Sequence, residues 1–126
     1  MFAHVSIGVK DIQKSVAFYD KVIVALGYER LFGDVEEKFM AYGPEDSFFI
    51  INEPLDTTKD VLACNGSHLC IKAQTKEQVD GFYAEALRLG AKDSGAPGIR
   101  EHYSDDYYAA FIFDPDGHKI EVLARV

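Results

Sequence analysis

The sequence predicts an α+β protein made of two βαβββ modules, and three observations carry this prediction. First, the chain of 126 residues repeats itself at an offset of 64: residues 4–7 (HVSI) match residues 68–71 (HLCI), and 18–19 (FY) match 82–83 (FY). Second, in each half a strand-like alternation changes to a helical periodicity, and third, each helical stretch stops at a glycine. Such a repeat normally indicates two modules that pack together, since one four-stranded module alone leaves a sheet face uncovered.

The first module, residues 1–53, opens with a strand in which apolar and polar residues alternate. Period two puts one set of side chains on one face and the other set on the opposite face: Val5, Ile7 and Val9 against His4, Ser6 and Gly8. We expect the apolar face to contact the helix. The polar face then carries the first histidine.

A helix follows, because apolar residues recur at helical spacing: Ile12, Val16, Tyr19, Ile23 and Leu26. Asp11 is expected to cap its start, and Gly27 suits the left-handed position after its end. Three extended segments complete the first module, at residues 28–33, 39–42 and 48–53.

Residues 54–66 are expected to link the modules, and residues 67–126 form the second one. Its helix starts with a capping box, Thr75 with Gln78, and ends at Gly90. The expected strands after the helix are 91–94, 107–113 and 119–123, with residues 95–98 (GAPG) as a plain turn. The alternative is a ferredoxin-like sandwich whose halves look alike by accident.

Composition limits the classes of function. A net charge of −8 opposes nucleic-acid binding, and no stretch is apolar enough for a membrane span. Phosphate-loop and dinucleotide fingerprints are absent, and two cysteines make no disulfide framework. The amino end shows no signal-peptide pattern, so we expect a single cytoplasmic domain with a small-molecule partner.

The last predicted hairpin places a carboxylate beside the two repeated histidines. Two strand runs flank a Pro-Asp-Gly turn, and Ile120 and Val122 take the helix-facing side. Glu121 therefore points to the opposite face, which His4 and His68 share if the modules pack symmetrically. Taken singly, each histidine is more often an ordinary structural residue, and Glu121 an ordinary strand carboxylate.

A histidine in the first strand, a second histidine opening the fifth, and Asp-Pro-Asp-Gly-x-x-Ile-Glu at 114–121 resemble the vicinal oxygen chelate superfamily. That group contains glyoxalase I, bleomycin-resistance proteins and extradiol dioxygenases, and the resemblance covers essentially the whole chain. It implies an open, cup-shaped mixed sheet with the helices on its outer face. It also implies a divalent metal (Fe, Mn, Ni or Zn) held by His4, His68 and Glu121, which the substrate chelates through adjacent oxygens.

One position departs from the glyoxalase I pattern. Those proteins add a fourth ligand, a glutamate, on the strand that matches residues 48–53. Aligning residues 44–46 with residues 115–117 matches Ile50 to Glu121. If the alignment shifts by one residue, Ile51 takes that place. Neither side chain binds metal, so the sequence argues against glyoxalase activity itself.

A segment before the last hairpin supplies candidates for substrate contact. Counting back across the turn places Ala110 opposite Glu121, so Tyr108 is predicted on the cup face beside it. We expect Glu121 and Tyr108 to act in catalysis. Arg100, His102 and Tyr108 are expected to contact an anionic or oxygen-rich substrate, although aromatic packing and a surface arginine would look the same.

Two functions follow from this set of residues. The first is a metal-dependent lyase, isomerase or dioxygenase that acts on a substrate with adjacent oxygens. The second is a metal-free binding protein of the bleomycin-resistance type. Exposed sheet edges also predict a homodimer.

Overall fold

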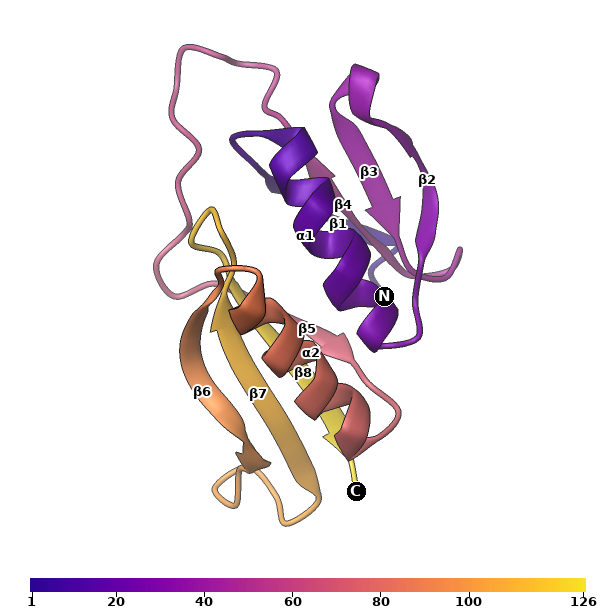
Figure 1. Cartoon of the computed structure of the whole chain (residues 1–126), viewed down its shortest axis with the longest axis vertical. Helices are drawn as coiled ribbons and strands as arrows, with labels where there is room; N and C mark the ends of the chain where they lie inside the picture. Colours follow the sequence, from indigo (N-terminus) through magenta and orange to yellow (C-terminus); the bar gives the residue numbers. More distant parts are fainter.

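The computed structural model describes all 126 residues and confirms two βαβββ modules (Figure 1). The first holds β1 (His4–Gly8), α1 (Ile12–Ala25), β2 (Arg30–Asp34), the 3-10 turn η1 (Val35–Glu37), β3 (Phe39–Tyr42) and β4 (Phe48–Asn52). The second holds β5 (His68–Lys72), α2 (Lys76–Arg88), β6 (Lys92–Ile99), β7 (Tyr107–Phe113) and β8 (Lys119–Arg125). The sequence offset of 64 separates β1 from β5 and α1 from α2.

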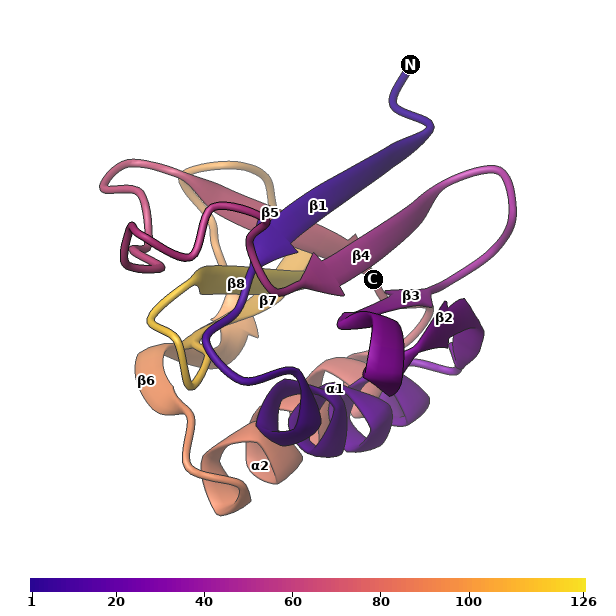
Figure 2. The same ribbon diagram turned by 90° about the horizontal axis from the view of Figure 1, so that it is seen from above.

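Each module forms its own mixed four-stranded sheet. The strand orders are β1-β4-β3-β2 and β5-β8-β7-β6, so the first strand of each module lies at an edge and runs parallel to the last. The two sheets are open, and the two helices pack against each other on one side of them (Figure 2). Neither helix has the length and apolar character that a membrane crossing requires.

The core lies between the two helices and the sheet faces against which they pack. Side chains at alternating strand positions are fully buried there, including Ile51, Ile120 and Val122. Tyr19 and Phe82, one from each helix, are buried as well. The predicted helix-facing side of the last strand is therefore confirmed, and Glu121 lies on the other face.

The helix ends follow the local rules. The Asp11 side chain accepts hydrogen bonds from the backbone N–H groups of Gln13 and Lys14, and Thr75 accepts one from Gln78. Gly27 and Gly90 adopt φ of +81° and +98° just past the helices, a region that glycine enters without steric cost. Both predicted starts and both predicted stops are confirmed.

The sixth strand is longer than predicted. Residues 95–98, expected as a plain turn, belong to β6, whose register against β7 shifts at Gly95 and Gly98. The glycines mark irregularities within an edge strand, and an edge strand also tolerates Pro97 because no neighbour needs its missing N–H. The sequence therefore predicted a turn here, because a bulged strand can have the composition of a loop.

The connection between β7 and β8 attaches the second module to the first. Tyr19 of α1 donates a hydrogen bond to Asp114 (2.5 Å), and the backbone N–H of Lys10 donates one to Asp116 (3.0 Å). The His118 ring donates from Nε2 to the carbonyl oxygen of Gly8 at 2.6 Å. The carboxyl end of β1 is therefore fixed beside the beginning of β8.

Candidate functional site

His68 and Glu121 meet on the sheet face that points away from α2. Cys70 stands directly opposite Glu121 in the parallel pairing of β5 with β8, and His68 stands opposite Lys119. The His68 Nε2 atom lies 2.9 Å from Oε2 of Glu121, whose side chain is almost fully buried. We call His68 and Glu121 the half-site. Their proximity agrees with the alternation argument, while a role as metal ligands stays a prediction.

Two further side chains surround the carboxylate of Glu121. The Tyr107 hydroxyl donates a hydrogen bond to Oε1 at 2.6 Å, so each carboxylate oxygen has a partner. Burial and the interaction with Glu121 raise the pKa of Tyr107, and the same two causes raise the pKa of Cys70 to about 12. At neutral pH the phenol and the thiol are therefore both protonated.

His4 does not join the half-site within one chain. The carboxyl end of β1 is fixed to His118, next to Lys119, which pairs with His68. His4 lies at the other end of β1, about 13 Å further along an extended strand. Its ring stacks on Phe48 (centroids 5.1 Å apart), and Figure 2 shows that end of β1 extending outward from the molecule. No three His, Cys, Asp or Glu side chains of one chain are arranged to hold a metal.

The register also identifies the counterpart of Glu121 in the first module. Ser6 pairs with Ile50, and Cys70, its equivalent in the repeat, pairs with Glu121. Ile50 therefore occupies the position in the first module that corresponds to Glu121, as the sequence alignment of the two halves indicated. An isoleucine offers no donor atom to a metal.

The predicted placement of Tyr108 is wrong. Phe111, and not Ala110, pairs with Glu121, so Tyr108 lies on the helix-facing side. Its hydroxyl donates a hydrogen bond to Asp80 of α2 at 2.6 Å. The count failed by one residue because the connection holds five residues, 114–118, in which Asp114 binds the backbone of Asp116 and His118. A shift of one residue moves every side chain to the opposite face.

Tyr107, which the sequence reasoning missed, therefore occupies the place expected of Tyr108. It pairs with Arg125 and lies on the same face as Phe111 and Glu121. The sequence held a usable signal, because an Asp at the first position of the connection favours hydrogen bonds to the backbone two to four residues on. A five-residue connection puts Tyr107 on the cup face.

Arg100 and His102 lie near this face, at different depths. The Arg100 guanidinium lies over the Phe111 ring, with Cζ 5.5 Å from the centroid. His102 is exposed and packs against Tyr103 (4.2 Å between centroids), which in turn packs against Tyr107 (5.0 Å). Arg100 thus shares a face with Glu121, whereas His102 lies at the rim.

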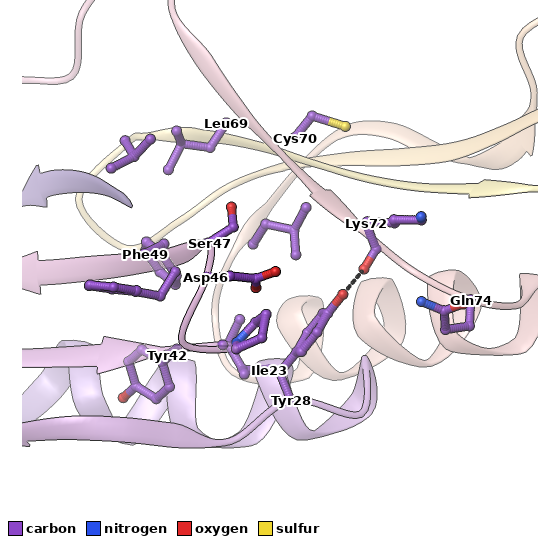
Figure 3. Close-up of a pocket in the computed structure, with 15 residues that line it drawn as sticks. Ile23, Tyr28, Tyr42, Asp46, Ser47, Phe49, Leu69, Cys70, Lys72 and Gln74 are labelled. Carbon is purple, nitrogen blue, oxygen red and sulfur yellow. Dashed lines mark hydrogen bonds between the residues drawn. The ribbon is translucent and has the colours of Figure 1, made fainter. Parts of the chain in front are cut away.

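A cavity lies apart from the half-site. It has a volume of about 670 Å³ and lies between the first module and β5, where the Tyr28 hydroxyl donates a hydrogen bond to the Lys72 carbonyl oxygen (Figure 3). Its lining is mainly apolar and includes Val5, Ile23, Phe49, Leu69 and Ile71. Of the cup residues described above it shares only Cys70.

The chain matches the Glyoxalase/Bleomycin resistance protein/Dioxygenase superfamily over residues 1–122, and it belongs to that superfamily. It is similar to a metallothiol transferase, FosB, from Shouchella clausii, with 24% identity over 119 residues. That match covers 94% of this chain and 76% of the relative.

Solved structures show the same fold. A glyoxalase/bleomycin resistance protein from Albidiferax ferrireducens is 34% identical, with a TM-score of 0.86, and the match covers 100% of this chain and 99% of that one. A point mutant of the fosfomycin resistance protein FosX from Listeria monocytogenes, in complex with Mn(II) and a dihydroxypropylphosphonic acid, is 19% identical with a TM-score of 0.68. That match covers 100% of this chain and 90% of FosX.

Proposed function

We propose that this protein is a metal-dependent enzyme that acts on a small substrate with adjacent oxygen atoms. His68 and Glu121 of one chain are two of the metal ligands. The third ligand is the partner's His4, supplied by a second copy of the chain in a homodimer. The observation that carries the proposal is the 2.9 Å approach of His68 Nε2 to a buried Glu121 oxygen. The complex of the relative FosX with Mn(II) and a dihydroxy compound supports this class of chemistry.

The half-site fits a divalent cation. Two donor atoms 2.9 Å apart have the spacing of neighbouring ligands that share one cation at about 2 Å. Imidazole with carboxylate suits Fe, Mn, Ni or Zn, and a set of two histidines and one carboxylate leaves positions open. A bound metal supplies Lewis-acid polarisation of the substrate oxygens.

A second copy of the chain is needed to supply the third ligand, because His4 of the same chain does not reach the half-site. Both β1 and β5 carry their histidines on free sheet edges, where a second copy can pair. Within one chain neither edge has a hydrogen-bonded neighbour on its outer side. Apposition of β1 of one protomer with β5 of its partner would bring the partner's His4 toward His68. The expected homodimer and the expected ligand set then become one proposal.

The surrounding residues have separate roles. Glu121 binds the metal and can exchange a proton with the substrate, and Tyr107 holds its carboxylate in place by the 2.6 Å hydrogen bond. Arg100 attracts an anionic part of the substrate from the same face. His102 contacts substrate at the rim. Tyr108, which faces α2, has no part in this proposal.

Removal of each ligand tests the proposal. His68→Ala and Glu121→Gln should abolish Mn²⁺ binding measured by calorimetry on chelator-treated protein, with unchanged circular dichroism. His102→Ala removes an imidazole from the same chain outside the half-site and should leave Mn²⁺ affinity unchanged. Wild-type affinity in both ligand variants would contradict the proposal.

A second candidate function is metal-free binding of an apolar or aromatic compound, and the 670 Å³ cavity between the modules favours it. Aromatic and aliphatic side chains line this cavity, as they do many small-molecule sites. If binding is the function, filling the cavity with Val5→Phe would prevent it, while His68→Ala would not. The two candidates therefore differ in which variant loses ligand.

A further inference from the structure

We infer that Arg100 and Lys119 form an oxyanion subsite next to the half-site, built on the ring of Phe111. This inference rests on the proposed function and deepens it, because it names the class of substrate: a small molecule that carries a carboxylate, phosphate or phosphonate group. We call Arg100, Phe111 and Lys119 the Phe111 subsite.

Two cationic groups lie against one aromatic ring. The Lys119 Nζ atom lies 5.1 Å from the Phe111 centroid, and the Arg100 Cζ atom lies 5.5 Å from it. Phe111 pairs directly with Glu121 across β7 and β8, and its ring centroid lies 6.1 Å from that of His68. The subsite and the half-site are therefore adjacent on one face.

Neither cation has a carboxylate partner. Each of the other arginines forms an ion pair, Arg30 with Asp20, Arg88 with Glu85 and Arg125 with Asp106, whereas Arg100 and Lys119 form none. Arg100 is therefore the one arginine without an ion pair in a chain that has 21 acidic residues and 13 Lys and Arg residues, while Lys119 resembles most of the lysines in having none. Two like charges on one ring repel each other, and a bound anion would offset that repulsion.

The guanidinium is held in place before any ligand arrives. Its Nη1 atom donates to the Gly98 carbonyl (3.0 Å) and Nη2 donates to that of Ala96 (2.8 Å), which leaves other donors free. A Cβ on Gly95 would lie 3.1 Å from Nη2, and one on Gly98 would lie 3.3 Å from Nη1. Both glycines therefore make room for the guanidinium, and this preorganisation lowers the cost of binding.

The geometry selects the ligand class. A planar guanidinium with free N–H groups recognises carboxylate, phosphate and phosphonate oxygens, and an ammonium adds a point charge. Because the half-site begins one ring away, the anionic group must sit on a short skeleton that also bears the chelating oxygens. A neutral carbonyl compound would bring no negative charge to balance the two cations.

Titration of metal-free protein with simple anions tests the subsite without any enzymatic activity. Methylphosphonate, inorganic phosphate and acetate are the probes, and chemical shifts of the backbone amides report binding. Arg100→Gln and Lys119→Gln should each weaken binding of the preferred anion by about tenfold, the loss expected for one hydrogen bond to a charged group. Comparison of the three anions identifies the preferred group.

Matched controls lie on the opposite side of the molecule. Arg88→Gln removes the same charge from α2, and Lys76→Gln removes a lysine that also lies over an aromatic ring, Tyr108, at 4.9 Å. Both should leave anion affinity unchanged. Because all four variants alter net charge equally, a general electrostatic effect would weaken binding in every one.

The outcomes separate this inference from the proposed function. Absence of anion binding to the wild-type protein, or equal binding by all variants, would overturn the subsite even if Mn²⁺ still requires His68. Anion binding that depends on Arg100 and Lys119 would support the subsite even if Mn²⁺ binding failed.

Discussion

Tyr107 and Tyr108 are neighbours in the chain whose hydroxyl groups act on opposite faces of one sheet. Tyr107 donates to Glu121, and Tyr108 donates to Asp80 of α2 at the same 2.6 Å distance. One hydrogen bond orients a candidate metal ligand, and the other joins a strand to a helix. The two residues therefore provide a matched comparison within a single structure.

Tyr107→Phe should weaken Mn²⁺ affinity by about tenfold or more, because loss of a hydrogen bond that orients a ligand typically has this effect. Tyr108→Phe should leave Mn²⁺ affinity unchanged. Calorimetry on both variants measures the difference. Equal affinities for the two variants would mean that Tyr107 does not position Glu121.

Tyr19→Phe should lower the free energy of unfolding by about 1–3 kcal/mol, because it leaves the buried Asp114 carboxyl without one partner. Urea unfolding followed by circular dichroism measures this change. The ring of Tyr19 is fully buried in the core and should keep its packing as phenylalanine. An unchanged midpoint would show that the contact between the modules adds nothing to stability.

At the scale of elements, local signals predicted local structure well. The caps at Asp11 and Thr75 and the glycine stops were predictable because each depends on a few consecutive residues. β6 was not, since its bulged stretch carries the composition of a turn and is extended only through pairing with β7. The register of β7 against β8 depends on side-chain hydrogen bonds inside the turn, so counting residues misplaced Tyr108.

The attachment of α1 to its sheet contains one charged cluster. Arg30 of β2 donates two hydrogen bonds to Asp20 of α1 (2.9 and 2.7 Å), and the Tyr42 hydroxyl donates a third at 2.8 Å. Burial acts to raise the pKa of Asp20, but the hydrogen bonds from Arg30 and Tyr42 outweigh it and lower that pKa. The ionised form of Asp20 therefore stabilises the fold.

Acid should remove this stabilisation. Because the folded pKa of Asp20 is lowered, its contribution is present above the ordinary range for aspartate, about 4, and is lost as pH falls through the folded value. The difference in free energy of unfolding between the wild type and Asp20→Asn should become smaller as the pH falls from about 4 through the folded pKa of Asp20. Urea unfolding at several pH values measures it, and a constant difference would contradict the assignment.

At the scale of the whole molecule, the sequence predicted that His68 and Glu121 share a face but not how the modules sit together. His68 and Glu121 meet because one sheet holds both, whereas His4 depends on the packing between modules. The contact of His118 with Gly8 puts the carboxyl end of β1 near β5, and His4 lies at the opposite end of β1. No local pattern in the sequence encodes that contact.

A dimer is the expected assembly. Light scattering at micromolar concentration should give about twice the 14.1 kDa mass of one chain, since the free edges of β1 and β5 have no partner within the chain. A species of one chain only would contradict it.

Mixing two inactive variants tests the shared metal site most directly. His4→Ala and His68→Ala should each lose Mn²⁺ binding alone, while chains unfolded together and refolded should regain about a quarter of the wild-type sites, since half of random dimers are mixed and each holds one intact site of two. Mn²⁺ bound per chain is measured by calorimetry. If the mixture binds no more Mn²⁺ than either variant alone, the partner's His4 does not complete the site.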